Sequence, residues 1–308
     1  MRIGTSDLDV SPLCLGGNPF GWTADEKTSF AVLDAYAAAG GNFIDTADLY
    51  GRPGAGGGES ETIIGRWLKS RGIRDRMVIA TKIGAVPGMS NLAPGTIRRG
   101  VENSLRRLGT DHIDLYFAHM DDHATPIADT LAAFDALVRA GKVRHIAASN
   151  FTAERLAASL ETSARNGLAS YVALQTEYNL VERTHYEIHL APTVAAGGLS
   201  CLPYVALARG FLTGKYRPGG PEVASPRAAR ARAHLGGNGP AVLAAMDEIA
   251  AAHRTTLAAV ALAWLAAQPT VATPLAGARN PAQLAELLPF LTLRLTSDEL
   301  ALLDKVSA

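Results

Sequence analysis

Four residues of types that can move protons or hold charge follow short apolar runs in this chain. In the segment NFIDTADLYG, residues 42–51, Asp45 follows two apolar residues and Tyr50 comes five residues later. Lys82 and His119 follow two further apolar runs. A lysine and an aspartate from adjacent strands can pair, and each then offsets the cost of burying the other. A tyrosine can act as a general acid, and a neutral histidine can donate a hydrogen bond to a carbonyl oxygen. These residue types together suit the reduction of a carbonyl group.

The acidity of the tyrosine is a specific expectation. If Lys82 lies beside Tyr50, its positive charge favours the phenolate, so we expect the pKa of Tyr50 to fall below its ordinary value of about 10. A shift of two units corresponds to about 2.7 kcal/mol. Such a tyrosine would be a general acid that is usable at neutral pH.

The pattern of apolar runs predicts the elements that must position these residues. Between the runs lie segments with helical periodicity, so strands and helices alternate along the chain. Eight such units predict an α/β fold, a single (β/α)8 TIM barrel over residues 1–308; an open doubly wound sheet is the alternative. The predicted strands are Leu13–Leu15, Phe43–Ile44, Met77–Ala80, Ile113–Phe117, Val143–Ala147, Tyr171–Leu174, Leu199–Pro203 and Val271–Leu275.

The boundaries of the helices follow from capping residues. Thr23, Thr125 and Thr152 are candidate N-caps, and glycines follow the helices. We also expect an N-terminal hairpin over Met1–Val10 that closes the barrel bottom, and a loop insertion after the seventh strand over Gly210–Pro240. The predicted helices are Ala24–Ala39, Ser60–Ser70, Pro94–Leu108, Pro126–Ala140, Thr152–Asn166 and, after the eighth unit, Ser297–Val306.

Composition excludes several classes of protein. The chain has 308 residues, 48% of them hydrophobic, and a formal net charge of zero, so there is no basic footprint for nucleic acid. The local excess of Arg227, Arg230 and Arg232 is interpreted as a solvated helix or loop face rather than a phosphate clamp.

The remaining composition signals concern location. The longest apolar run, Leu257–Ala267, is too short to span a bilayer and predicts a buried helix. Cys14 and Cys201 lie in apolar runs and are expected to pack in the core of a protein from a reducing compartment. With no apolar leader at the N-terminus, we expect a soluble, cytoplasmic protein with no membrane partner.

Polar residues end nearly every predicted strand. A polar residue inside a barrel strand is costly, but the carboxyl ends of the strands form the active-site face of this architecture. A single histidine or glutamine is more often structural, whereas seven polar strand ends together indicate a site. They are Asp45, Lys82, His119, Ser149–Asn150, Gln175, Tyr204 and, just beyond the last strand, Arg279.

The chain resembles the aldo-keto reductases over its whole length. The resemblance is carried by FIDTADLYG, VIATKIG, DLYFAH, AASNF, LQTEYNL, PYVALARGFLTGKY and TPLAGARNPAQLAE. The catalytic aspartate, tyrosine, lysine and histidine of that family fall on Asp45, Tyr50, Lys82 and His119. The resemblance implies an NADPH-dependent oxidoreductase that reduces aldehydes or ketones, with Tyr50 as the proton donor and a small carbonyl compound as substrate.

The resemblance also implies where NADPH would bind. The nicotinamide carboxamide would be held by Ser149, Asn150 and Gln175, and Tyr204 would stack on the ring. Arg279 is expected to bind a 2′-phosphate because a guanidinium matches phosphate geometry, and Pro281 starts a helix there. The residues expected along the rest of the cofactor are Leu207, Gly210 and Lys215 at the pyrophosphate and Gly277, Arg279 and Gln283 toward the adenosine.

Three departures from the family pattern affect the finer contacts. Val205 and Ala206 replace a Ser-Pro pair and remove a hydroxyl from the pyrophosphate side, and Leu287 replaces an asparagine at the adenine site. A proline common after His119 is absent, so we expect the substrate loop to differ from that of its relatives. Phe20 and Trp22 are expected in the substrate pocket, although a core position suits Phe20 equally well.

Three other functions fit parts of the sequence. An NADPH-binding sensor like the channel β-subunits of this family would keep the same four residues. A Schiff-base lyase would need a neutral Lys82, which Asp45 disfavours. A metal hydrolase would need paired ligands that His112, His119 and His123 do not supply, so no metal is expected.

Overall fold

The computed structural model describes residues 1–54 and 56–308 and has the predicted (β/α)8 barrel. Eight parallel strands follow one another around the barrel in the order β7-β6-β5-β4-β3-β2-β1-β8. The strands are β1 (Cys14–Gly16), β2 (Phe43–Asp45), β3 (Val78–Ile83), β4 (Ile113–Ala118), β5 (Val143–Ser149), β6 (Tyr171–Glu177), β7 (Ser200–Tyr204) and β8 (Leu275–Ala276).

The barrel closes between β7 and the segment that leads into β8. Cys201 and Val271 form an isolated parallel bridge, in which the Cys201 amide donates to the Thr270 carbonyl at 2.8 Å. The predicted eighth strand is therefore divided into this bridge and the two-residue β8. Pro274 lies between them and has no N–H to donate to a ladder.

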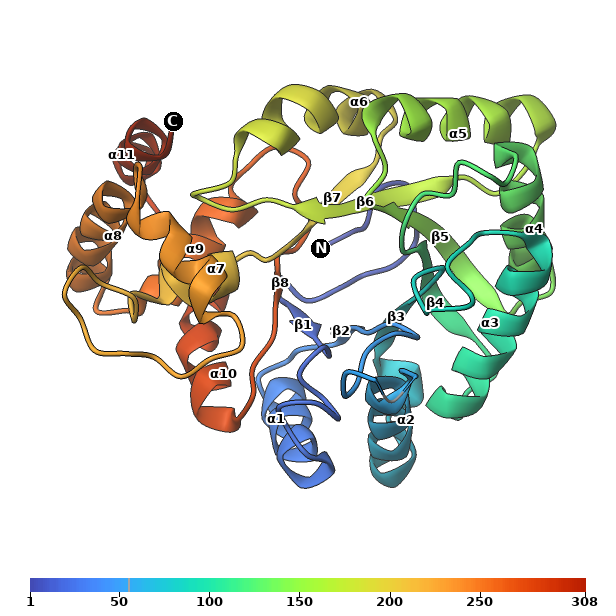
Figure 1. Ribbon diagram of the computed structural model, residues 1–308, viewed down its shortest axis with the longest axis horizontal. Helices are drawn as coiled ribbons and strands as arrows, with labels where there is room; N and C mark the ends of the chain where they lie inside the picture. Colours follow the sequence, from blue (N-terminus) through green and yellow to red (C-terminus); the bar gives the residue numbers. More distant parts are fainter. Residues whose placement is uncertain (55) are drawn as a thin grey trace.

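Helices surround the strands on the outside (Figure 1). The α-helices are α1 (Glu26–Ala38), α2 (Glu59–Arg71), α3 (Pro94–Leu108), α4 (Ile127–Arg139), α5 (Ala153–Asn166), α6 (Ala191–Ala196), α7 (Ala228–Arg232), α8 (Gly239–His253), α9 (Leu257–Ala266), α10 (Pro281–Leu287) and α11 (Ser297–Ser307). Short helical segments are η1 (Arg74–Arg76), η2 (His185–Leu190), η3 (Ala208–Thr213), η4 (Ala233–Leu235) and η5 (Leu288–Leu291).

The helix starts correct two of the three predicted N-caps. Asp25, not Thr23, caps α1 by accepting from the Thr28 amide at 2.8 Å. Thr125 does not cap α4, because its hydroxyl donates to the Asp122 carboxylate instead. Thr152 does cap α5, as predicted. Asp is at least as good a cap as Thr, so the residue type alone could not separate neighbouring candidates.

The N-terminal hairpin closes one end of the barrel, as predicted. Arg2 and Asp9 form an antiparallel bridge, and the Val10 amide donates to the Met1 carbonyl at 2.8 Å. Apolar side chains of the hairpin pack with those that fill the barrel. This interior cluster is Ile3, Leu8, Val10, Cys14, Phe43, Val78, Ala80, Leu115, Phe117, Ala147, Val172, Ala173, Leu202, Ala272 and Leu275.

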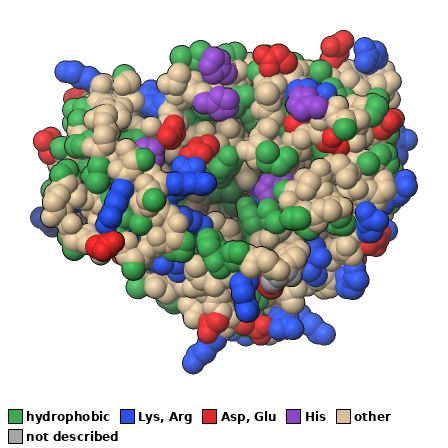
Figure 2. All heavy atoms as spheres, viewed as in Figure 1, with side chains coloured by type: hydrophobic (Ala, Val, Ile, Leu, Met, Phe, Trp, Pro, Cys, Tyr) green, Lys and Arg blue, Asp and Glu red, His purple; other side chains and the backbone are tan. Residues whose placement is uncertain are grey.

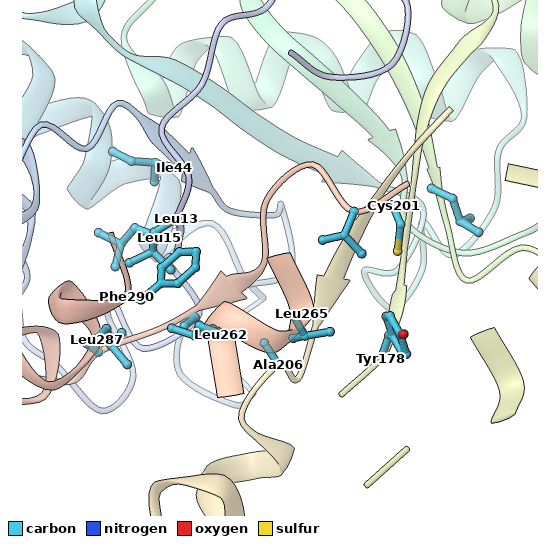
Figure 3. Packing of buried hydrophobic residues seen from close by; sticks show 14 of the residues in the cluster. Leu13, Leu15, Ile44, Tyr178, Cys201, Ala206, Leu262, Leu265, Leu287 and Phe290 are labelled. Atoms are coloured by element: carbon cyan, nitrogen blue, oxygen red, sulfur yellow. The ribbon is translucent and has the colours of Figure 1, made fainter. Parts of the chain in front are cut away.

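A second and larger core lies between the strands and the helices. Figure 3 shows part of it, including Leu13 and Leu15, Phe290 of η5 and Leu265 of α9. α9 is almost entirely buried, as predicted for this apolar run. In the described part of the chain no single helix is long and apolar enough to cross a membrane, although α8 and α9, bent by 99°, pass that test as a pair.

The long segment after β7 is the predicted insertion. It contains η3, an irregular stretch, α7 and η4 before α8 begins at Gly239. Its first residues have strained backbones, since Val205, Ala208 and Arg209 have positive φ angles of 54°, 47° and 57°. Left-handed conformations are costly for residues with a side chain, and they concentrate at functional sites.

Candidate active site

The alternation of each strand directs the predicted site residues into the barrel. In β2, Phe43 belongs to the interior cluster and Ile44 to the outer core, so Asp45 shares the inward face of Phe43. In β3, Val78 and Ala80 lie inside, which places Lys82 on the same inward face. The same two-residue period, counted from interior residues of β4 to β7, indicates an inward direction at the carboxyl ends of these strands for His119, which follows β4 directly, and for Ser149, Gln175 and Tyr204.

Asp45 and Lys82 form a buried ion pair at the base of the site. The Lys82 Nζ donates to both carboxylate oxygens of Asp45 at 2.7 and 2.6 Å and to the Thr46 carbonyl at 2.7 Å. The Gln175 amide also donates to Asp45, at 3.0 Å. Burial is the largest single effect and lowers the pKa of Lys82, but the charge and hydrogen bonds of Asp45, together with the nearby Tyr50, raise it by more in sum and hold the pKa of the ammonium above its ordinary value. The lysine is therefore charged at neutral pH.

The loop after β2 holds Tyr50 above this ion pair. The Lys82 Nζ lies 4.9 Å from the centroid of the Tyr50 ring. The Tyr50 carbonyl accepts from the amides of Gly58 and Ser60 at 3.1 and 3.3 Å, which fixes both ends of the loop. Gly57 permits this path, because its φ is +83° and a Cβ there would lie 2.3 Å from the Asp48 carbonyl oxygen.

The net shift of the Tyr50 pKa is opposite to the prediction. Burial of the phenol raises the pKa of Tyr50, and the nearby Lys82 charge lowers it only in part. The Asp45 carboxylate, which is paired with Lys82, also raises the pKa of Tyr50 and so opposes the effect of the lysine. Tyr50 is consequently a protonated phenol at neutral pH.

His119 faces Tyr50 across the site. Their ring centroids are 6.0 Å apart at an interplanar angle of 83°. Burial, assisted by the Lys82 charge, lowers the pKa of His119 to about 3. The imidazole is therefore neutral near pH 7, so it can donate one hydrogen bond.

Hydroxyl and amide groups line the neighbouring strand ends. The Asn150 amide donates to the His119 carbonyl at 2.9 Å and to the Ser149 hydroxyl at 3.0 Å. The Tyr204 hydroxyl donates to the Asn150 Oδ1 at 2.8 Å. These bonds hold Ser149, Asn150 and Tyr204 in one group on the β5–β7 side of the mouth.

A cavity of about 1060 Å³ opens over these residues. Figure 2 shows a hollow near the middle of this face, with hydrophobic and basic side chains around it. Lys82 lies below the lining, while Phe20 is fully buried in the outer core and does not line the cavity. The other predicted site residues all line it: Trp22, Asp45, Tyr50, His119, Ser149, Asn150, Gln175, Tyr204, Leu207, Gly210, Lys215, Gly277, Arg279 and Gln283.

The far end of the cavity is basic. Arg279 lies beside Gln283, whose Oε1 accepts from the Arg279 amide at 3.0 Å. Burial and the charge of Arg279 lower the pKa of Lys215, so these two cations are close enough to repel each other. The short helix α10 has fewer free N-terminal amides for a phosphate than predicted, because Asn280 caps it by accepting a hydrogen bond from the Gln283 amide at 2.9 Å.

Two of the three arginines predicted to form a solvated face line this cavity. Arg227 and Arg230 are exposed, but they face the cavity, whereas Arg232 does not. The sequence could not show this, because the path of the long segment after β7 brings them back over the mouth. Sequence reasoning also did not identify Asn18, Glu177 and Arg209 as lining residues.

A buried carboxyl behind the Tyr50 loop was likewise not predicted. Asp48 is 3% exposed, and neither of its carboxylate oxygens has a hydrogen-bond partner among the described residues. Burial raises the pKa of Asp48 to about 7, and the nearby Glu61 contributes to the rise. Across residues 1–54 and 56–308, no group of three or more His, Cys, Asp or Glu side chains is arranged to hold a metal ion.

The raised pKa of Asp48 predicts a pH-dependent stability. Between its ordinary value of 3.8 and about 7, the folded state keeps the proton that the unfolded chain loses. Stability from this group is thus full at acid pH and is lost as the pH rises through about 7. Asp48→Asn should therefore raise the free energy of unfolding at about pH 8, by an amount on the order of 4 kcal/mol, and have little effect on it at about pH 4.

Urea unfolding at both pH values would measure this difference. Glu248→Gln, which removes an exposed carboxylate from α8, is the control and should change the free energy of unfolding little at either pH. If Asp48→Asn changed the free energy of unfolding equally at both pH values, the pKa of Asp48 would not be raised in the folded state.

Comparisons with known proteins agree with this geometry. A family model described as the Aldo/keto reductase family matches residues 12–308. The chain is 34% identical to the Uncharacterized oxidoreductase YrpG of Bacillus subtilis, over 99% of this chain and 94% of the relative. It is 33% identical to Protein tas of Escherichia coli, over 99% of this chain and 96% of the relative. It is also 33% identical to the Norsolorinic acid reductase stcV of Emericella nidulans, over 95% of this chain and 77% of the relative.

Proposed function

Because the chain belongs to the aldo/keto reductase family of NAD(P)H-dependent oxidoreductases, we propose that it reduces aldehydes or ketones to alcohols with NADPH. We further propose that Tyr50 gives the proton to the carbonyl oxygen. The observation that carries the proposal is the arrangement of Tyr50 and His119 at the cavity wall, directly above the buried Asp45–Lys82 pair. A bound NADPH would supply the hydride.

Each proposed catalytic residue has a separate physical task. Tyr50 holds its proton at neutral pH because its pKa is raised, so it is in the donor form. His119 is neutral and can orient the carbonyl oxygen by a hydrogen bond. When the oxygen gains charge, the Tyr50 proton moves to it, and Lys82 stabilises the phenolate that remains. Asp45 keeps Lys82 charged and fixed through two hydrogen bonds.

The lining residues fit the cofactor in the chemistry of their donor groups. One end offers the amides and hydroxyls of Ser149, Asn150 and Gln175, which can hold a carboxamide. The other end offers Lys215 and Arg279, whose charges suit phosphates. Tyr204 is partly buried between the two and presents an aromatic ring to the cavity.

We also propose that the protein works in the cytoplasm. Cys14 and Cys201 are buried, free thiols, as expected in a reducing compartment. Burial raises the pKa of both thiols, so neither carries the thiolate that oxidation requires.

The function is tested by following NADPH oxidation with aliphatic, aromatic, sugar and ketone carbonyls. The expected result is turnover of at least one class of carbonyl, and loss of that turnover when one of the four proposed catalytic residues is replaced. Tight NADPH binding with no turnover of any carbonyl would instead favour the sensor function and would contradict the proposal.

The choice of NADPH over NADH is expected to depend on Arg279. Charge-assisted bonds to phosphate contribute about 1.5 to 3 kcal/mol, so Arg279→Ala should weaken NADPH binding by about ten-fold to a hundred-fold or more. NADH lacks the 2′-phosphate, and its affinity should hardly change. Fluorescence titration of both cofactors measures the two dissociation constants.

Arg98→Ala is the matched control, since Arg98 is an exposed arginine of α3 that does not line the cavity. It should leave both affinities unchanged. Equal losses for NADPH and NADH in Arg279→Ala would mean that Arg279 binds another part of the cofactor, and a wild-type preference for NADH would overturn the choice of NADPH.

A further inference from the structure

The imidazole of His119 is not oriented by a hydrogen bond to its buried nitrogen. His119 Nδ1 is buried and has no hydrogen-bond partner among the residues that the structure describes. In many active sites a hydrogen bond to one ring nitrogen sets the orientation and the tautomer of the imidazole. Because the described chain supplies no such bond here, the direction of the His119 ring depends on how its backbone and the neighbouring chain are held.

Two backbone hydrogen bonds hold His119 itself. Its amide donates to the Ile83 carbonyl at 2.8 Å, and its carbonyl accepts from the Asn150 side-chain amide at 2.9 Å. These bonds tie the end of β4 to its two neighbours, β3 and β5 (Figure 1). No proline restricts the backbone between His119 and Thr125, so the course of the chain after His119 must be fixed by other contacts.

Asp121, two residues after His119, is bound to the helix that follows β5. Arg155 of α5 donates from Nε and Nη2 to the two carboxylate oxygens of Asp121, at 2.7 and 2.9 Å. The same Nη2 donates to the Asp122 carbonyl at 3.2 Å. His123 Nε2 lies 3.3 Å from the same carboxylate, on the exposed side. The Asp121 side chain is 9% exposed, so this paired contact is stronger than an ion pair at the surface.

The next residue, Asp122, anchors the other side of the same segment. Its carboxylate accepts from the Leu92 amide at 2.8 Å, in the loop after β3, and from the Thr125 hydroxyl at 2.6 Å. The two consecutive aspartates therefore hold the segment after β4 from both sides. On the α5 side, the bond from Arg155 to Asp121 joins the same two segments as the bond from Asn150 to the His119 carbonyl.

We propose that Asp121 and Arg155 are positioning residues for His119, whose ion pair holds the segment after β4 so that the imidazole can donate to the carbonyl oxygen of the substrate. This inference rests on the reductase function proposed above. It adds to the site two residues that do not line the cavity and act through His119.

The first test is kinetic. Asp121→Asn and Arg155→Gln should each lower kcat by about ten-fold to a hundred-fold, because a displacement of about 1 Å at a catalytic group is enough for a loss of this size. NADPH affinity should hardly change, since Asn150 keeps its bonds to Ser149 and Tyr204. Arg155→Lys should retain more activity than Arg155→Gln, because it keeps the charge without the paired donors.

Arg71→Gln is the matched control. Arg71 of α2 donates to both carboxylate oxygens of Asp34 of α1, at 2.9 and 2.7 Å, and neither residue lines the cavity. Breaking this paired contact should leave kcat unchanged. Urea unfolding of each variant separates a loss of stability from a loss of rate.

A double-variant cycle identifies the residue through which the pair acts. If Asp121 serves to position His119, Asp121→Asn should lower kcat in the wild type and have little further effect in His119→Gln. Equal fold losses in the two backgrounds would refute the proposal. So would wild-type turnover in Asp121→Asn and Arg155→Gln.

A spectroscopic measurement makes the test independent of turnover. The His119 and Tyr50 ring centroids are 6.0 Å apart, so their ring protons should show a nuclear Overhauser effect in the NADPH-bound protein. The His119 signals are assigned by their loss in His119→Gln. The effect should weaken in Asp121→Asn and stay unchanged in Arg71→Gln, and an unchanged effect in Asp121→Asn would overturn the positioning role. If the wild type reduced no carbonyl at all, the reductase function would fall, while this measurement would still decide whether the pair positions His119.

Discussion

Tyr50→Phe should lower kcat by a factor on the order of 10² to 10⁴, the range for loss of a general acid. The ring remains, so its packing over Lys82 and against His119 is kept and only the proton is lost. NADPH affinity should hardly change. Stopped-flow and steady-state rates with a good carbonyl substrate, together with NADPH titration, measure both quantities.

The pH profile gives this prediction a second test. Because the pKa of Tyr50 is raised, the wild type should stay active until alkaline pH, where the phenol loses its proton. The small residual activity of Tyr50→Phe should lack that alkaline decline. Tyr216→Phe is the control, since Tyr216 is a buried tyrosine whose hydroxyl has no partner in the described chain and does not line the cavity. Near-wild-type turnover of Tyr50→Phe would refute its role as proton donor.

Lys82→Met should reduce both stability and rate. Removing the ammonium leaves the Asp45 carboxylate buried, at 2% exposure, and among the described residues the Gln175 amide is its one remaining donor. An uncompensated buried charge typically costs about 3 to 5 kcal/mol. The rate should fall as well, because nothing then stabilises the phenolate of Tyr50. Urea unfolding and steady-state kinetics measure the two losses.

Two variants make the cause of this loss identifiable. In Asp45→Asn/Lys82→Met both charges are gone, so most of the stability should return while the activity stays low. Lys142→Met breaks the exposed ion pair with Glu102 and should cost no more than about 1 kcal/mol. If the double variant were as unstable as Lys82→Met, the loss would come from packing and not from an unpaired charge.

The sequence by itself was sufficient for the fold and for the position of most site residues along the strands. A two-residue period carries Phe43 and Asp45, or Ala80 and Lys82, to the same face of a strand whatever the rest of the chain does. Parallel strands in a barrel then bring those inward ends to one mouth. The ion pair of Asp45 with Lys82 follows from adjacency of β2 and β3, and it is present in the structure.

Local patterns could not decide between close alternatives. The N-cap of α1 falls on Asp25 instead of Thr23, because either residue can accept from a first-turn amide. The eighth strand is shorter than its apolar run, since Pro274 interrupts its ladder. Phe20 could have been a pocket or a core residue, and burial places it in the core.

Only the tertiary structure decided the electrostatics and the path of the long segment after β7. The sign of the Tyr50 pKa shift depends on the balance between burial, which raises the pKa, and the Lys82 charge, which lowers it. Neither the burial of the phenol nor its distance from Lys82 can be read from a sequence. The contact of the Arg227 guanidinium with the Trp22 ring depends on where an irregular segment crosses the barrel mouth. Periodicity describes regular elements, where each residue's direction is fixed by its neighbours, whereas a loop has no such repeat and takes its course from the surface on which it packs.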